Sequence, residues 1–241
     1  MPGSSDQQPE ISIVAPVYNE EENIHLLVEG ISSIMDRLGR LYEIVLVDDG
    51  SDDSSWKIMK REAADRVNLV LIKFEENAGQ TAAFDAGFRK ARGKTIVTID
   101  SDLQYDPEDI PRLLDLSSEW DVVCGIRASR RDNWWKQLCS RIANSVRRAL
   151  TGDPVTDTGC SLKVFRREHL LKLKLYEGMH RFFPTLLRME GCTITETPVK
   201  HLPRRHGVSK YSARNRMLRS LFDCLLIRWM QRRKLRYKVE L

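Results

Sequence analysis

The feature that most constrains the fold is the alternation of short β-branched runs with amphipathic segments in the first half of the chain. Five such runs are typical of buried strands, and they span residues 11–17, 42–48, 68–74, 94–100 and 121–126. The segment between the first two has helical spacing and places on one face Ile24, Leu27, Val28, Ile31 and Ile34. Strands that alternate with helices about every 25 residues indicate βαβ units. The predicted fold class is therefore α/β, with a mostly parallel sheet flanked by helices.

Further helices are predicted over 52–66 and 79–93, the second closed by Gly93 as its C-cap. After residue 127 the pattern predicts a basic amphipathic helix, a strand, a helix, a strand and a last helix, in the segments 133–150, 160–166, 180–190, 192–202 and 214–233. The predicted organisation has three parts: a disordered lead, one α/β domain and a basic amphipathic helix, over residues 1–10, 11–212 and 213–241.

The composition indicates in which cellular compartment the protein is expected. The longest stretch without a charge has nine residues, whereas a transmembrane helix needs about 20 mostly apolar ones, so we expect no transmembrane segment. The first ten residues lack the basic and apolar regions of a signal peptide. The five cysteines are scattered without a CxxC pair, which favours reduced thiols and a cytoplasmic location. Neither these cysteines nor the five histidines have the spacing of a zinc site.

The net charge of +5 hides a strongly basic C-terminal part. Residues 200–241 contain 13 Lys and Arg against 2 Asp and Glu, a net +11, and the remainder contains 26 against 32, a net −6. This excess predicts an anionic partner. The last helix has an apolar stripe flanked by basic residues. This arrangement favours peripheral attachment to an anionic membrane. The stripe consists of Leu218, Leu221, Phe222, Leu225 and Trp229.

A second membrane contact is predicted at Trp134 and Trp135. The alternative is that both helices pack on the core or form the interface of a homo-oligomer.

Acidic residues follow the strand predicted at 94–100. Asp100 ends this strand, Asp102 comes two residues later, and Gln104 adds an amide oxygen nearby. Two or three oxygen ligands with open positions suit Mg²⁺ or Mn²⁺ carrying a diphosphate. The alternative is a solvated turn in which Asp106 caps a helix that begins at Pro107. Capping would account for Asp106 and leave Asp100 and Asp102 unexplained.

Polar clusters also follow two other strands. Asp48 and Asp49 precede Gly50, although a turn with Ser51 or Asp53 as the cap of the next helix would explain the same pattern. Pro16 within a strand suggests that this strand end faces a cavity, and Glu20 could cap a helix or meet a ligand hydroxyl.

The turn at 76–83 could approach a phosphate. The chain has no P-loop and no GxGxxG, which argues against ordinary ATPases and nicotinamide enzymes.

Seven segments in this order resemble the family-2 glycosyltransferases with a GT-A fold. The resemblance is strongest to the polyprenyl-phosphate glycosyltransferases of the dolichyl-phosphate mannose synthase type. The segments cover residues 11 to about 212 and read "VAPVYNEEENI", "VLVDDGSDDSS", "NAGQTAA", "IDSDLQYDPEDIP", "CGIR", "DTGCSLKVFRR" and "PRRHGVSKYS". The combination of "DSDLQ" with a downstream "RxxGxSKY" points to a lipid-phosphate acceptor.

The resemblance implies a role for each matching residue. The nucleotide-sugar donor would be bound by Pro16, Tyr18, Glu20, Asp48, Asp49 and Asp100. The divalent ion, Mg²⁺ or Mn²⁺, would be held by Asp100, Asp102 and Gln104. Arg127 would contact the donor phosphates and Asp157 would lie near the reacting sugar. The acceptor phosphate would be gripped by Arg204, Ser209 and Lys210. The catalytic set would then be Asp102, Arg127, Asp157, Arg204 and Lys210.

The implied reaction is direct displacement with inversion at the anomeric carbon, because a phosphate monoester is largely dianionic at neutral pH and needs no strong general base. Two alternatives stay open. One is a soluble family-2 enzyme acting on a saccharide or protein, and the other is a non-catalytic binder of nucleotide sugars or nucleic acid. No nucleic-acid partner is predicted, because the basic tail has few stacking aromatics, namely Tyr211, Trp229 and Tyr237. The sequence does not identify the sugar or the base.

Overall fold

The structure is a computed structural model that describes residues 8–127, 145, 147–153, 155–203 and 213–235, with the backbone alone over 213–220. The chain forms two compact units. One contains Met1–Arg130 and Asp157–Val208, and the other contains Arg131–Thr156 and Ser209–Leu241. The predicted division into a domain at 11–212 and a helix at 213–241 stays a prediction.

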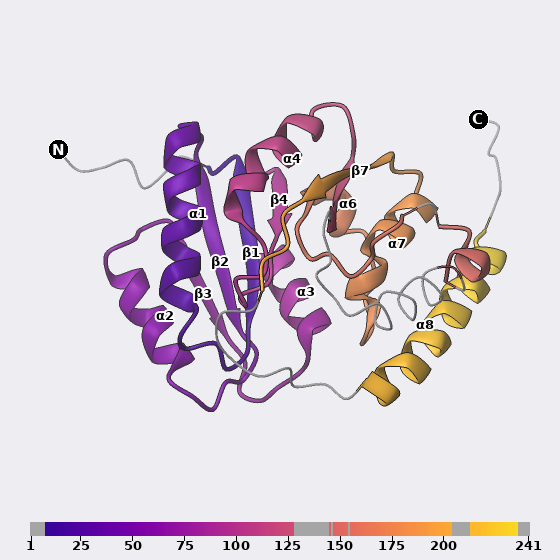
Figure 1. The fold of residues 1–241 in the computed structure, drawn as a ribbon, viewed down its shortest axis with the longest axis horizontal. Helices are drawn as coiled ribbons and strands as arrows, with labels where there is room; N and C mark the ends of the chain where they lie inside the picture. Colours follow the sequence, from indigo (N-terminus) through magenta and orange to yellow (C-terminus); the bar gives the residue numbers. More distant parts are fainter. Residues whose placement is uncertain (1–7, 128–144, 146, 154, 204–212, 236–241) are drawn as a thin grey trace. The chain divides into compact units, whose positions relative to one another are not determined.

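The first unit is built on one seven-stranded sheet with the order β3-β2-β1-β4-β6-β5-β7 (Figure 1). Its strands are β1 (Ile11–Val17), β2 (Tyr42–Asp48), β3 (Leu69–Lys73), β4 (Thr95–Thr98), β5 (Val122–Arg127), β6 (Lys163–Arg166) and β7 (Ile194–Val199). Neighbouring strands pair in parallel except that β6 is antiparallel to both β4 and β5. The predicted α/β class and mostly parallel sheet are confirmed.

Helices cover both faces of this sheet (Figure 1). The helices of this unit are α1 (Ile24–Leu38), α2 (Ser55–Ala64), α3 (Gln80–Lys90), η1 (Pro107–Asp109), α4 (Ile110–Leu116), α6 (Arg167–Leu170), η2 (Met179–Phe182) and α7 (Phe183–Met189). On one side, α1 contacts α2 and α4. On the other side, α3 and α7 meet through an edge-to-face contact between Phe88 and Phe183, whose ring centroids lie 5.4 Å apart.

Strand β1 is buried along its whole length because helices pack on both of its sides. Its residues Ile11 and Ile13 join the core that includes α1. Its opposite face meets α3, where a Cβ added to Gly87 would lie 2.4 Å from the Val14 Cγ1 atom. The absence of a side chain at Gly87 therefore allows α3 to lie directly against β1.

The prediction that Gly93 caps α3 is wrong. The helix is capped at Ala91, which has an extended backbone with φ −57° and ψ 137°. Gly93 serves a close approach instead, since its N–H donates to the Ser12 Oγ atom at 2.8 Å and an added Cβ would lie 2.6 Å from the Ser12 backbone nitrogen. Glycine is needed here for space and not for a left-handed conformation.

The second unit contains α8 (Ala213–Arg233) and a helical stretch at 147–151. Two side chains of α8 donate to main-chain carbonyls of that stretch: Arg228 Nη1 to Leu150 O at 2.7 Å and Gln231 Nε2 to Thr151 O at 2.6 Å. Among the described residues, no helix has both the length and the apolar character needed to cross a membrane.

Candidate functional site

The candidate site begins where the strand order of the sheet reverses. The chain proceeds from β1 to β2 and β3 on one side and then returns to β4 on the other side of β1. Loops that leave two such neighbouring strands in opposite directions open a crevice at their carboxyl ends, where α/β proteins bind ligands. Pro16 is the second-to-last residue of β1, the loop after β1 contains half-buried Tyr18 and Glu20, and the loop after β4 contains Asp100–Gln104.

Pro16 is tolerated in a central strand because β4 has already ended beside it. The pairing of β1 with β4 stops at Val14 opposite Thr98. Beyond that point the Pro16 carbonyl accepts a hydrogen bond from the Ser101 hydroxyl at 2.8 Å. A proline has no N–H to lose from the ladder where no partner strand remains. The sequence expectation that this strand end faces a cavity stays a prediction.

The turn after β4 is fixed by contacts to its acidic side chains. The Gln80 amide donates to Asp100 Oδ1 at 2.8 Å, and the Gln104 N–H donates to Asp102 Oδ1 at 3.1 Å. Leu103 between them has φ +58°, a left-handed conformation that is costly for a branched side chain. Asp102 is only 8% exposed. The left-handed Leu103 therefore lies in a turn whose two acidic side chains are each held by a hydrogen bond.

The donor set of this turn fits a divalent cation. Two carboxylates separated by one residue, with the side-chain amide of Gln104 nearby, supply the hard oxygen ligands of Mg²⁺ or Mn²⁺. Asp106 has a different task, because its carboxylate accepts the Glu108 N–H at 3.0 Å and caps η1. The predicted cap at Asp106 is confirmed, and it leaves Asp100 and Asp102 for another purpose.

Two residues that hold Asp100 were not singled out from the sequence. Gln80 is the first residue of α3, and Ser161 accepts the Asp100 N–H on its Oγ atom at 3.1 Å. The small-residue turn at 76–83 was recognised as a possible phosphate contact, so the polar residue just after Gly79 was the available signal for Gln80. Ser161 carried no such signal, because it lies 61 residues from Asp100 in the chain.

The loops after β1 and β2 are bonded to each other. Asn19, which has φ +54°, donates its N–H to Ser51 Oγ at 3.0 Å and accepts the Asp52 N–H on its side chain at 2.9 Å. The Glu20 N–H donates to Ser55 Oγ at 2.9 Å, and the Glu20 carboxylate accepts from the Asn23 amide at 2.6 Å. These bonds set one side of the crevice before any ligand arrives.

Asp48 and Asp49 are adjacent in sequence but differ in their surroundings. Both are buried. Asp48 Oδ1 accepts the Ser51 N–H at 3.1 Å, while its buried Oδ2 atom has no hydrogen-bond partner within the part of the chain that the structure describes. A buried acceptor of this kind is costly unless a ligand satisfies it, as expected for a residue that binds the donor.

Asp49 is bonded to the next loop. Its Oδ1 atom accepts the N–H groups of Ala78 at 2.8 Å and Gly79 at 3.0 Å, and its Oδ2 atom accepts the Asn77 amide at 3.1 Å. Burial, together with the charge of Asp48, raises the pKa of Asp49 despite these hydrogen bonds. The carboxylate holds the 77–79 turn in place, so its role here is in the shape of the crevice.

Arg127 and Asp157 form one ion pair. The resemblance had implied separate roles for them, at the donor phosphates and near the reacting sugar. Arg127 Nε and Nη2 both lie 2.7 Å from the Asp157 carboxylate oxygens. A Cβ on Gly159 would lie 2.8 Å from Arg127 Nη2, so this glycine makes room for the guanidinium. Burial alone would lower the pKa of Arg127, but the Asp157 carboxylate outweighs burial and raises it.

Glu196 on β7 extends this pair and was not found from the sequence. Its Oε1 atom accepts the Asp157 N–H at 3.4 Å.

The predicted acceptor residues Arg204, Ser209 and Lys210 lie outside the described residues, as do Trp134 and Trp135. Their roles remain predictions.

Comparison with known proteins begins with a family model. The model described as "Glycosyl transferase family 2" matches residues 12–173, which is most of the sheet and both sides of the crevice.

Curated relatives give a more specific resemblance. The chain is 39% identical over 204 residues to an undecaprenyl-phosphate 4-deoxy-4-formamido-L-arabinose transferase from Edwardsiella ictaluri, covering 83% of the chain and 62% of the relative. The transferase of the same name from Pseudomonas aeruginosa PAO1 is 40% identical over 215 residues, covering 88% of the chain and 63% of the relative. The chain thus spans less than two thirds of the length of these relatives.

Solved structures support the fold. Glucosyl-3-phosphoglycerate synthase from Mycobacterium tuberculosis, solved with Mn²⁺, UDP and phosphoglyceric acid, aligns with a TM-score of 0.69 at 20% identity, covering 93% of the chain and 80% of that structure. A mannosyltransferase from Pyrobaculum calidifontis, solved with GDP-Man and Mn²⁺, aligns with a TM-score of 0.60 at 21% identity, covering 83% of the chain and 59% of that structure.

Proposed function

The chain belongs to glycosyl transferase family 2, and from this premise we propose that it transfers a sugar from a nucleoside diphosphate to a polyprenyl phosphate with inversion at the anomeric carbon. The observation that carries the proposal is the position of the Asp100–Gln104 turn at the reversal of strand order, tied to β1 through Ser101 and to α3 through Gln80. The names of the curated relatives favour the polyprenyl phosphate as acceptor.

The donor lies across the carboxyl ends of β1, β2 and β4. Asp48 Oδ2, the buried acceptor without a partner among the described residues, receives an N–H or O–H of the nucleoside. The cross-bonded loops after β1 and β2 hold Tyr18 and Glu20 beside it. Binding therefore requires little reordering of these loops, which lowers its entropic cost.

The diphosphate needs compensation for its charge. Asp100 and Asp102, with Gln104, hold Mg²⁺ or Mn²⁺, which when bound neutralises the leaving nucleoside diphosphate. Gln80 and Ser161 fix Asp100 on two sides, so the carboxylate is oriented before the cation arrives.

The transfer breaks the bond between the anomeric carbon and the diphosphate oxygen, which leaves with the electron pair. The acceptor phosphate oxygen forms the new bond from the opposite side. Since a phosphate monoester has a second pKa of about 6, the nucleophile is already a dianion at neutral pH. The chain must mainly hold two anions in line, and Arg127, oriented by Asp157, supplies a fixed positive charge near them.

We also infer that α8 attaches the protein to an anionic membrane surface. On one side of the helix Cys224 and Ile227 are buried. The opposite side exposes a stripe at helical spacing that consists of Leu221, Phe222, Leu225, Leu226 and Trp229. Phe222 is 71% and Trp229 59% exposed. Exposed Arg232, Arg233 and Lys234 follow this stripe, the arrangement of an in-plane membrane helix.

The first experiment measures product formation from UDP- and GDP-linked sugars, with undecaprenyl or dolichyl phosphate as acceptor and with Mn²⁺, Mg²⁺ or EDTA. The panel includes donors of 4-deoxy-4-formamido-L-arabinose, glucose and mannose. We expect metal-dependent transfer with one donor, and a loss of at least about 100-fold in kcat/KM for Asp102→Asn. Asp106→Asn is the matched control, because asparagine also caps a helix and the variant should keep full activity.

Transfer to an unphosphorylated saccharide instead of the polyprenyl phosphate would overturn the acceptor assignment and leave the donor site standing. Nucleotide binding without turnover on any acceptor would favour the non-catalytic alternative.

The membrane inference is tested by flotation with phosphatidylglycerol vesicles. Phe222→Ser combined with Trp229→Ser should abolish binding, while substitution of exposed Leu235 by Ser should weaken it little. Unchanged flotation of the double variant would contradict the inference.

A further inference from the structure

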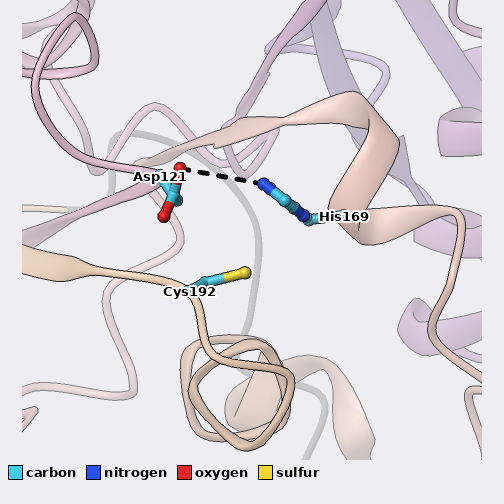
Figure 2. Close-up of side chains that lie close together, drawn as sticks. All are labelled: Asp121, His169 and Cys192. Carbon is cyan, nitrogen blue, oxygen red and sulfur yellow. Dashed lines mark ion pairs between the residues drawn. The ribbon is translucent and has the colours of Figure 1, made fainter. Parts of the chain in front are cut away.

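Three residues of the types that bind zinc meet at the opposite end of the strands from the candidate site. Asp121 immediately precedes β5, His169 lies on α6 directly after β6, and Cys192 lies two residues before β7. One ligand atom of each residue lies within 4.8 Å of the others, and Figure 2 shows the three side chains around one common space. They are separated by 48 and 23 residues in the sequence, so no spacing rule could group them.

This cluster is distinct from the donor site. The donor site occupies the carboxyl ends of β1, β2 and β4, whereas Asp121 and Cys192 precede parallel strands β5 and β7. His169 follows the antiparallel strand β6, whose carboxyl end lies at the same edge. The three residues therefore sit at the amino edge of the parallel strands, opposite to the crevice.

The Asp121 carboxylate is held in position by its neighbours. Its Oδ2 atom accepts the Thr193 N–H at 2.9 Å and the Thr193 hydroxyl at 2.8 Å. Its Oδ1 atom lies 3.7 Å from His169 Nε2, too far for a hydrogen bond. Two tetrahedral zinc ligands at about 2.0–2.2 Å from the ion lie about 3.4 Å apart, so this separation matches a shared ion better than a direct bond.

We propose that Asp121, His169 and Cys192 bind one Zn²⁺ ion, with a water molecule as the fourth ligand. One thiolate, one imidazole and one carboxylate favour zinc over magnesium, which prefers oxygen ligands alone. Cys192 is 7% exposed, while the side chains of Asp121 and His169 are 19% and 23% exposed. The ion can therefore enter from solvent past these two residues and reach the buried sulfur.

Arg166 competes for the same carboxylate. Its Nε atom lies 3.2 Å from Asp121 Oδ1, and its side chain is 43% exposed. An exposed guanidinium can turn into solvent at little cost, since an ion pair open to solvent contributes little to stability. The proposal therefore predicts that Arg166→Ala binds zinc more tightly than the unchanged chain.

The bound ion would join three separate segments. Asp121 precedes β5, His169 belongs to α6 and Cys192 precedes β7, so one ion links the beginnings of two neighbouring strands to a short helix. Such a link stabilises the folded state by an amount that grows with the logarithm of the ion concentration over its Kd. The proposed role is structural and does not depend on the proposed transferase activity.

The test uses the full chain carrying Asp102→Asn, which removes a ligand of the donor-site cation. Metal-free protein is titrated with Co²⁺ and then with Zn²⁺. We expect one equivalent of Co²⁺ to give thiolate-to-metal charge-transfer absorption with intense tetrahedral d–d bands, and Zn²⁺ to abolish both. X-ray absorption of the zinc form should show one sulfur at about 2.3 Å.

Cys192→Ser should remove the charge-transfer band and weaken zinc binding at least about 100-fold. His169→Gln, at a partly exposed position, should weaken it similarly and still fold. Cys224→Ser is the matched control that should change neither spectrum nor affinity, because this buried cysteine lies outside the cluster. Cobalt bound without a sulfur ligand, or a spectrum unchanged in Cys192→Ser, would overturn the proposal.

Discussion

The two halves of the sheet hold the charged residues of the candidate site in different ways. In the half formed by β1 to β4, the acids of the candidate site follow their own strands within a few residues and are bonded mainly to backbone N–H groups, hydroxyls and amides. In the half formed by β5 to β7, the candidate site residues Arg127 and Asp157 lie 30 residues apart and meet as an ion pair.

This difference has an energetic consequence. Removing one neutral donor leaves the other hydrogen bonds of such a loop in place. A buried ion pair that loses one member leaves an uncompensated charge and costs considerably more. Substitutions of Arg127 or Asp157 should therefore lower stability as well as turnover, and those around Asp100 should act chiefly on cation binding and turnover.

The largest expected effect is that of Asp157→Ala. The Asp157 side chain is 6% and the Arg127 side chain 20% exposed, so the guanidinium would remain buried without its partner. We expect the free energy of unfolding to fall by about 3–5 kcal/mol, measured by urea denaturation. Arg127→Ala should cost a similar amount, and the double variant should cost less than the sum of the two. A loss below about 1 kcal/mol would show that water compensates the free guanidinium.

The second prediction concerns pH and His180. Burial, aided by the positive charges of Arg181 and Lys163, lowers the pKa of His180 to about 3. An unfolded histidine titrates near pH 6.5, so between these values the unfolded state binds the proton and the folded state does not. The stability present above pH 6.5 should therefore fall by about 2–4 kcal/mol as the pH falls toward 3.

Denaturation of the unchanged chain and of His180→Gln from pH 7 to pH 4 checks this prediction. The variant should lose part of the acid sensitivity, because glutamine does not titrate. His180 Nδ1 lies 2.8 Å from the Thr81 hydroxyl, so glutamine can keep a polar contact there. Parallel stability curves for the two proteins would show that His180 is not the group responsible.

The third prediction concerns Gln80 as a positioning residue. Gln80→Ala removes the amide that orients Asp100 and should lower Mn²⁺ affinity and kcat about 10- to 100-fold each, with little change in the free energy of unfolding. Mn²⁺ binding is measured by electron paramagnetic resonance and turnover by product formation. Lys90→Ala, at the exposed far end of α3, is the matched control and should behave as the unchanged chain. Equal Mn²⁺ affinity in both variants would remove Gln80 from the cation site.

The contrast between local and distant contacts also explains which features of the fold and of the candidate site could be predicted from the sequence. Asp100, Asp102 and Asp48 drew attention because each lies at or just after the end of its own β-branched strand, where α/β sheets bind ligands, and the resemblance to family-2 glycosyltransferases then implied their roles. The positions of the strands were predicted for the same reason, since a buried parallel strand is a local apolar pattern. The cap at Asp106 is local as well and was also predicted.

Features that depend on contacts between distant segments were not predicted. Ser161 and Glu196 act on residues 61 and 39 positions away. The cluster of His169 and Cys192 depends on β6 running against its neighbours, which no local pattern reveals. Gly93 was misassigned because a glycine after a helix suggests a C-cap, whereas here the reason for glycine is the backbone of Ser12.

The smallest expected effect is that of an exposed ion pair in the β1 to β4 half. Arg37 on α1 donates to both carboxylate oxygens of Glu108 on η1, at 2.7 and 2.6 Å, and their side chains are 60% and 49% exposed. Both bonds come from Arg37 Nη2, whereas Arg127 uses Nε and Nη2, so the exposed pair is weaker in geometry as well as in burial. A double-mutant cycle on Arg37→Ala and Glu108→Ala should give a coupling of about 0.5 kcal/mol that shrinks in 0.5 M salt. A coupling as large as that of Arg127 with Asp157 would mean that neither burial nor the two-nitrogen geometry sets the strength of the Arg127 pair.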